Sequence, residues 1–175
     1  MIMAEGCRTL IIGLGNPILG DDGIGWRAVE AFRDQYASLL TDQPVDIDFL
    51  SVGGLSLMER MVDFECAILV DAALTGKYPS GFVAAFPIEQ LPKFAQGHLS
   101  SSHDTTLQNA LAVGRQMGAC LPVEIWVITI EAENTYEFSE QLSPAVASAI
   151  PQAVEAVWKL LAVTRANPST EAALA

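Results

Sequence analysis

The chain has 175 residues, of which 51% are hydrophobic and only 17% are charged. This length and composition predict one folded domain with a substantial core, and they exclude an intrinsically disordered chain. A net charge of −12 disfavours binding to a nucleic acid or to an anionic membrane, because both would repel such a surface.

The first part of the chain alternates strand-like and helix-like segments. Residues 9–14 (TLIIGL) predict a buried strand, and residues 24–40 predict a helix. The apolar face of this helix consists of Val29, Phe32, Tyr36 and either Leu39 or Leu40. Residues 45–52 then alternate as in a strand, and a short helix is expected around 55–62.

The middle of the chain predicts two more strands and a helix. Residues 66–72 (CAILVDA) predict a buried strand, and residues 81–88 predict another. Because the link between them is short, 81–88 is expected to pair antiparallel. Residues 89–103, with three consecutive serines, predict a loop, and a helix is expected over 104–118. The apolar face of that helix consists of Leu107, Ala110, Leu111, Gly114 and Met117.

The last elements are a strand over residues 123–130 (VEIWVITI) and a helix that begins at Ser143-Pro144. Serine is a favourable N-cap, and proline is favourable at the first helical position. Pro151 is expected to kink or split the helix. Its apolar face consists of Val146, Ile150, Ala153, Val157, Leu160 and Leu161.

This alternation predicts a single α/β domain over residues 1–164, followed by a frayed tail at 165–175. We expect a mixed, mainly parallel sheet of about five strands with helices on both faces. In such sheets, sites form beyond the carboxyl ends of the strands. Polar residues at those ends are therefore the candidates for function.

The three cysteines, Cys7, Cys66 and Cys120, are widely spaced and form no CxxC pair. They predict neither a disulfide framework nor a zinc knuckle, and Cys66 is expected to be a buried core thiol. The sequence contains no recognisable signal peptide or membrane-spanning run. We therefore expect a cytoplasmic protein, and a monomer.

The densest motif is GLGNPILGDDGIG at residues 13–25, directly after the first predicted strand. A dinucleotide fingerprint would require glycine three residues after Gly15, where Ile18 stands, and the two aspartates would repel a pyrophosphate. A structural alternative is that Asp21 or Asp22 caps the following helix. Capping would explain Asp21 just as well as a functional role would, but it does not explain why a second acid, Asp22, stands beside it.

Three further candidates are Asp71, His98 and His103. Asp71 ends a buried strand, where it would face the crevice, although a solvated acid at a strand end is also ordinary. His98 lies in mid-loop and is expected to be solvated, whereas His103 lies at a loop–helix junction. Together, Asp22, Asp71 and His103 would offer two carboxylates and one imidazole, a set with open positions that suits nickel or zinc.

These residues stand in stretches that resemble the hydrogenase maturation proteases. Those endopeptidases trim the C-terminal extension from the large subunit of nickel–iron hydrogenases. The resemblance is carried by GLGNPILGDDGIG at 13–25, Gly53-Gly54-Leu55, ILVDA at 68–72, SSHDTTLQNAL at 101–111, and Leu142-Ser143-Pro144. Their order and spacing agree with the family along nearly the whole chain.

The resemblance implies a mixed sheet flanked by helices and a site formed by Asp22, Asp71 and His103. It implies that these ligands recognise nickel already installed in the large-subunit precursor. The nickel would then arrive with the substrate, while zinc or cadmium could occupy the ligands in vitro. The family is often classed with aspartic peptidases. A water polarised by the metal, or deprotonated by one of the acids, would attack the scissile carbonyl.

Substrate contacts are expected beside this ligand set, at Asn16, Gly53 and Gly54. The paired glycines depart from the family pattern, because Leu55 follows them where threonine is expected. The acidic segment from Glu131 to Glu140 has no function that its sequence assigns.

Two alternatives remain at the level of sequence. GLGNP also opens peptidyl-tRNA hydrolases, but those enzymes need a histidine soon after the motif and a basic face for tRNA. This chain has no histidine before His98 and a net charge of −12. A non-catalytic nickel-binding maturation chaperone would use the same three ligands without cutting a peptide bond.

Overall fold

A computed structural model describes residues 8–91 and 106–166. Five strands form one sheet in the order β2-β1-β3-β5-β4. Their bounds are β1 Thr9–Leu14, β2 Val45–Leu50, β3 Cys66–Ala73, β4 Val83–Pro87 and β5 Glu124–Glu131. β4 runs antiparallel to β5, and all other pairs are parallel. The mixed, mainly parallel sheet predicted from the sequence is confirmed, and the antiparallel strand pairs with β5.

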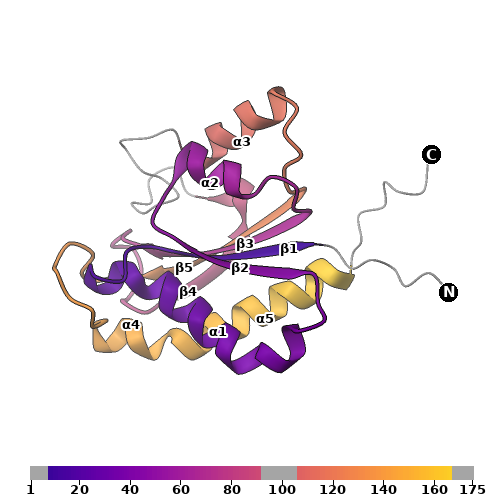
Figure 1. The fold of residues 1–175 in the computed structure, drawn as a ribbon. Helices are drawn as coiled ribbons and strands as arrows, with labels where there is room; N and C mark the ends of the chain where they lie inside the picture. The colour runs from indigo at the N-terminus through magenta and orange to yellow at the C-terminus, as the bar shows by residue number, and fades with distance from the viewer. Residues whose placement is uncertain (1–7, 92–105, 167–175) are drawn as a thin grey trace.

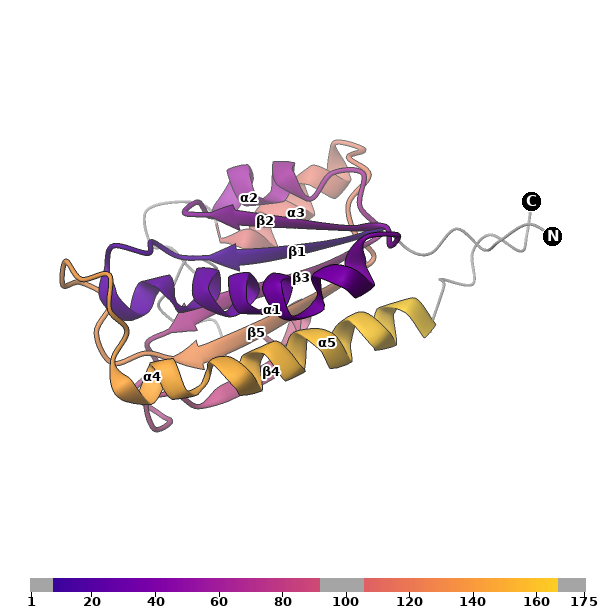
Figure 2. The same ribbon diagram turned by 60° about the horizontal axis from the view of Figure 1, so that its bottom comes forward.

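Helices cover both faces of the sheet, as Figures 1 and 2 show. One face carries α1 (Ile24–Leu40), α4 (Pro144–Ser148) and α5 (Ile150–Ala166), and the other carries α2 (Gly54–Arg60) and α3 (Leu107–Gln116). Two short 3₁₀ helices, η1 (Gly20–Gly23) and η2 (Ile88–Gln90), lie between these elements. No helix in the described ranges is long and apolar enough to cross a membrane.

β3 lies at the centre of the sheet, and every one of its residues is buried. Ile68 and Val70 pack on the side of α1 and α5, and Ala67 and Leu69 pack on the side of α2 and α3. Because both faces are covered, the strand has a continuous apolar run in place of alternation.

The predicted bounds of β1 and α1 are confirmed. On α1, Val29 and Phe32 are fully buried, and Tyr36 stacks on Trp158 of α5 with 4.3 Å between ring centroids. Leu40 completes the apolar face by packing against the core. The sequence left this position open between Leu40 and its neighbour Leu39, which is 55% exposed.

α3 differs from its prediction at the C-terminal end. The helix ends at Gln116, and Met117 is 81% exposed, so placing Met117 on the apolar face was wrong. At the start, Thr106 is the N-cap, and its hydroxyl accepts a hydrogen bond from the Asn109 N–H at 3.3 Å. Residues 92–105, which contain most of the predicted loop, lie outside the described residues.

The final helix is split in two, as Pro151 predicts. α4 begins after the N-cap Ser143 with proline in its first turn, and α5 begins at Ile150. All but one of the predicted face residues are buried, and Ile150 is half-buried. α5 ends at Ala166, and residues 167–175 of the predicted tail lie outside the described residues.

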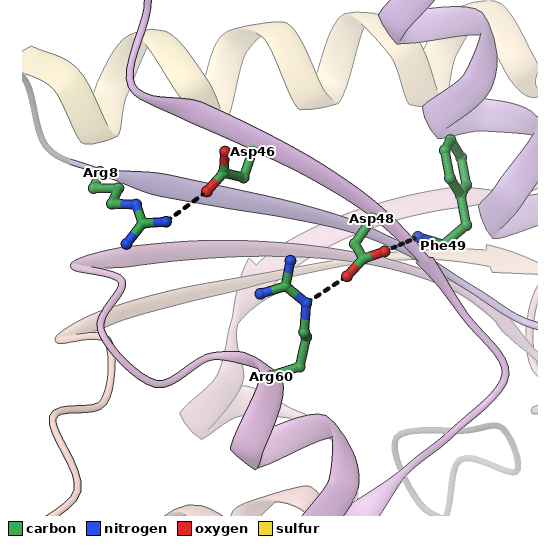
Figure 3. Close-up of polar contacts among 5 residues, drawn as sticks. All are labelled: Arg8, Asp46, Asp48, Phe49 and Arg60. Atoms are coloured by element: carbon green, nitrogen blue, oxygen red, sulfur yellow. Dashed lines mark hydrogen bonds and ion pairs between the residues drawn. The ribbon is translucent and has the colours of Figure 1, made fainter.

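β2 is an edge strand and is half-buried throughout. It ends at Leu50, opposite Leu14, two residues before the predicted end at residue 52. Two arginines form ion pairs with the aspartates of this edge strand (Figure 3). Arg8 pairs with Asp46 at 2.9 Å, and Arg60, the last residue of α2, pairs with Asp48.

The two arginines at this edge also flank one aromatic ring. The guanidinium groups of Arg8 and Arg60 lie 4.3 and 5.6 Å from the centroid of Phe64. Each arginine therefore contacts a carboxylate of β2 and the same phenyl ring, which tethers the edge strand to its neighbours.

The two ends of the sheet differ in what they carry. Arg8, where the described chain begins, and Ala166, where it ends, lie at the amino edge, the end of the sheet at which β1, β3 and β5 start (Figures 1 and 2). The opposite end, where these three strands finish, is called the carboxyl edge below. The motif at residues 13–25 lies at the carboxyl edge.

Candidate functional site

The glycine-rich motif packs tightly onto the ends of β1 and β3. Gly15 has φ +123°, and a Cβ there would lie 1.8 Å from the Asp22 carbonyl oxygen. A Cβ on Gly25 would lie 2.2 Å from the Leu14 carbonyl oxygen and 2.3 Å from that of Val70. Only glycine permits these approaches, which bring Asp22 back over the end of β1.

Asp22 is half-buried, and its Oδ2 accepts a hydrogen bond from the Asn16 N–H at 2.6 Å. Neither Asp22 nor Asp21 caps a helix, because the N-caps of η1 and α1 are Leu19 and Gly23 and no side chain bonds there. The capping alternative was therefore wrong for both aspartates. The carboxylate of Asp22 instead closes the loop that follows β1.

Asp21 is 1% exposed and binds a different segment. Its Oδ2 accepts hydrogen bonds from the N–H groups of Glu133 and Asn134 at 3.1 and 3.0 Å. Its Oδ1 accepts from the Ser143 N–H at 2.6 Å. Asp21 thus fixes the chain between β5 and α4 to the glycine-rich loop. The sequence carries no local signal for this, since the partners lie more than 100 residues away.

Asp71 is 1% exposed and lies near the carboxyl end of β3, in register with Thr129 of β5. Because side chains alternate along a strand, Asp71 follows Ala67 and Leu69 on the side of α2 and α3. η1, which contains Asp22, lies against β3. The structure therefore places Asp22 and Asp71 at the same carboxyl edge.

The third predicted ligand, His103, lies outside the described residues, as does His98. Within residues 8–91 and 106–166, no three His, Cys, Asp or Glu side chains form a metal-binding group. The set of Asp22, Asp71 and His103 therefore stays a prediction.

The described cysteines lie at the amino edge. Cys66 begins β3 and is 4% exposed, which confirms its expected burial, and Cys120 precedes β5. Asp71 is five residues further along β3, so a distance of roughly 16 Å separates it from Cys66 along the strand. Cys7 is not among the described residues.

The predicted substrate contacts lie near the same edge as the two aspartates. Asn16 follows β1, and its Oδ1 accepts from the Ile18 N–H at 3.2 Å. Gly53 and Gly54 follow β2, where Gly54 has φ +51° and opens α2. Leu55, which departs from the family pattern, is 43% exposed. Contact of these residues with a substrate stays a prediction.

Glu131 is a structural residue that its acidic neighbours conceal in the sequence. It is 4% exposed, and Oε1 accepts from the N–H groups of Thr75 and Gly76 at 2.8 and 2.7 Å. Its Oε2 accepts from the Thr75 hydroxyl at 2.7 Å. Because side chains alternate along a strand, Glu131 lies on the same side of β5 as the buried Val127, and this spacing could have predicted its burial.

A cavity of about 190 Å³ lies along β4 and β5 at the carboxyl edge. Thr129, the register partner of Asp71, lines it, and so does Ala73, two residues beyond Asp71 on β3. Tyr78 and Phe82 stack on one another at the cavity with 4.5 Å between ring centroids. An aromatic-lined recess therefore adjoins the buried acid.

Comparison with known proteins identifies the family. A family model described as hydrogenase maturation protease matches residues 46–160. The chain belongs to the hydrogenase maturation protease family. The match contains Asp71 and His103, and it begins after Asp22.

Two relatives that align with most of the chain have names that agree with this family. The hydrogenase expression/formation protein HupD of Rhodobacter capsulatus is 31% identical over 158 residues, covering 89% of this chain and 72% of HupD. The hydrogenase 2 maturation protease of Escherichia coli is 29% identical over 154 residues, and the alignment covers 88% of this chain and 90% of the E. coli protein.

Solved structures share the fold. The hydrogenase maturating endopeptidase HybD of E. coli superposes with a TM-score of 0.67 at 25% identity, over 90% of this chain and 93% of its own. A [NiFe] hydrogenase maturation protease from Thermococcus kodakarensis gives a TM-score of 0.63 at 25% identity, over 88% and 99% of the two chains. As a hydrogenase maturation protease, the chain is a hydrolase of the endopeptidase class.

Proposed function

We propose that this hydrogenase maturation protease removes the C-terminal extension from the nickel-loaded precursor of a nickel–iron hydrogenase large subunit. Family membership supports the type of reaction and the class of substrate. The observation that carries the proposal is the position of Asp22 and Asp71 at one carboxyl edge, where α/β sheets bind their ligands.

The donor chemistry at this edge fits nickel brought by the precursor. Asp22 and Asp71 supply carboxylate oxygens, and His103 adds an imidazole, a set that suits a divalent transition metal. In support of this set, β3 holds Asp71 at the carboxyl edge, and the Asn16 N–H bonds the Asp22 carboxylate at the same edge. A cysteine-bound nickel of the precursor would keep positions open for these three ligands.

The residues of this chain then position the scissile peptide bond and a water. Contact with nickel fixes the precursor. One of the two acids accepts a proton from the water as the water oxygen bonds to the carbonyl carbon, and it returns that proton to the amide nitrogen as the C–N bond breaks, which yields a carboxylate and a free amine. The cavity beside Thr129 has a volume of about 190 Å³, which is smaller than the pockets that hold drug-sized ligands. A cavity of this size would accept one side chain of the precursor next to the scissile bond. This acid-assisted attack accords with an aspartic-type peptidase.

The test is to incubate the purified protein with nickel-loaded and nickel-free precursor and to measure the precursor mass over time. We expect loss of the extension from the loaded precursor only. About 3 kcal/mol of lost coordination energy would give a preference above a hundredfold. Equal cleavage of both forms would contradict nickel recognition and favour a two-carboxylate mechanism without metal.

The same assay distinguishes a protease from the alternative of a non-catalytic chaperone. A non-catalytic nickel-binding chaperone would bind the loaded precursor without changing its mass. The matched control is Asp22→Asn, which keeps the shape of the side chain and removes its charge. Cleavage by the wild-type protein but not by this variant supports the assignment of Asp22.

A further inference from the structure

The segment between β5 and α4, residues 132–143, carries the most exposed aromatic side chains of the described chain. Tyr136 is 75% exposed and Phe138 is 87% exposed. Figures 1 and 2 show this segment standing out beside the start of α1. Large apolar side chains that protrude in this way mark surfaces that bind other proteins.

Hydrogen bonds to the glycine-rich motif hold this segment in place. Gly20 N–H donates to the Ser139 carbonyl at 2.7 Å, and Ser139 N–H donates to the Ile18 carbonyl at 3.0 Å. Asp21 adds its backbone N–H, which donates to the Asn134 carbonyl at 2.9 Å, and its carboxylate, which accepts three further bonds. The two aromatic residues are therefore presented by an ordered loop that is bonded to the residue next to Asp22.

The apolar surface extends from this loop toward α1. Ile18 is 46% exposed. Beside it lies a surface cavity of about 370 Å³ whose apolar lining includes Pro17, Ile18, Trp26 and Phe49, and Glu140 of the loop also lines it. A recess next to protruding aromatic residues suits a folded protein surface better than a small ligand, which would need to be enclosed.

The charges around the aromatic residues are mainly acidic. Glu133, Glu137 and Glu140 are exposed, and residues 131–140 contain no lysine or arginine. Arg27 and Arg33 of α1 face the same cavity, but both lie within 4 Å of Glu30. A complementary partner would therefore present apolar side chains bordered by lysine or arginine.

We infer that Tyr136, Phe138 and Ile18 form a docking surface for the folded body of the large-subunit precursor. The docked patch of the precursor is apolar with a basic border. This inference rests on the proposed function, which makes the precursor the substrate. Docking beside the site adds affinity that the extension alone does not provide, and it aligns the extension with the carboxyl edge.

The experiment compares wild-type protein with Tyr136→Ser/Phe138→Ser, using nickel-loaded precursor. We expect the double variant to raise KM and the Kd of the complex at least about tenfold with kcat retained, because buried aromatic residues dominate binding at interfaces. The matched control is Met117→Ser/Val123→Ser, which removes exposed apolar side chains near the amino edge. That control is expected to leave KM and Kd unchanged.

A second arm tests the charges. Glu133→Gln/Glu137→Gln is expected to weaken the dependence of Kd on salt concentration, whereas Glu155→Gln, on the exposed side of α5, is expected to leave it unchanged. The far-UV circular dichroism spectrum and the unfolding midpoint of each variant show whether the fold is kept.

The outcomes separate the docking surface from the proposed function. If wild-type protein cleaves the precursor and the double variant has the same KM and Kd, the docking surface is wrong and the protease function stands. If wild-type protein binds without cleaving and the double variant loses binding, the docking surface stands and the proposed cleavage fails. If wild-type protein neither binds nor cleaves, both are wrong.

Discussion

Asp21 and Asp22 are adjacent acids in contrasting environments. The carboxylate of Asp21 is buried and accepts hydrogen bonds from three backbone N–H groups of the chain between β5 and α4. Asp22 is half-buried and accepts one from the loop after β1. At the scale of residues, the buried acid therefore joins distant loops, whereas the half-buried acid is the one for which we predict a ligand role.

Substituting Asp21 is expected to lower stability more than the loss of a helix cap would. Asp21→Ala leaves three N–H groups without the acceptor that they bond, so we expect the free energy of unfolding to fall by at least about 2 kcal/mol. Urea denaturation measures this loss. Asp34→Ala, which removes an exposed ion pair with Arg33, is the control and should change stability by less than about 0.5 kcal/mol.

Asp22→Asn is expected to abolish cleavage while the protein stays folded. The amide oxygen can still accept from the Asn16 N–H, but the charge that a divalent cation needs is gone. The measurements are precursor cleavage and the urea midpoint. A working Asp22→Asn together with a folded but inactive Asp21→Ala would reverse the two assignments.

The two histidines are expected to differ in the same assay. His103→Ala should abolish cleavage with little loss of stability, because His103 is the predicted imidazole ligand and the sequence assigns it to no apolar helix face. His98→Ala should remain active. Equal loss of activity in both variants would contradict the assignment of His103.

At the scale of elements, the site depends on how closely α1 approaches the sheet. The first turn of α1 contacts both β1 and β3 through Gly25, so the helix and the glycine-rich loop are placed by backbone contacts. The motif that carries the strongest sequence resemblance to the family is therefore also the motif that positions Asp22.

Gly25→Ala is expected to destabilise the protein by about 3 kcal/mol, because the new methyl group would overlap two carbonyl oxygens and force α1 away from the sheet. Gly76→Ala is the control. Gly76 has φ +66° but open space around it, so only backbone strain of about 1 kcal/mol is expected. Similar losses in the two variants would show that close packing of α1 is not the cause.

The elements were largely predictable because their signals are local. β1, α1 and the split at Pro151 follow from apolar period, glycine and proline, and each was found where the sequence indicated. Met117 was misplaced because an apolar residue in helical register predicts burial even when the helix has ended. Asp21 and Glu131 were missed because their partners come from distant segments, which no local pattern reveals.

At the scale of the whole molecule, the two described cysteines and the two candidate ligands Asp22 and Asp71 lie at opposite edges of the sheet. Cys66 and Cys120 lie at the starts of strands, and Asp22 and Asp71 lie where strands finish. The described cysteines therefore cannot join the carboxylates around one ion.

The purified protein is accordingly expected to hold substoichiometric metal, since two carboxylates and one imidazole lack the soft ligands of a structural zinc site. Elemental analysis after dialysis measures this. One tightly bound metal ion per chain would contradict the view that nickel arrives with the precursor. Unfolding midpoints with and without a chelator should also agree.

The position of the ends of the described chain has a practical consequence for handling this protein. Arg8 and Ala166 both lie at the amino edge, away from the aspartates and from the glycine-rich loop. A tag or a surface linkage attached at either end would project from the amino edge and leave the carboxyl edge facing the solution. Immobilised protein should therefore capture and process precursor as the free protein does, whereas coupling through residues 132–143 should block it.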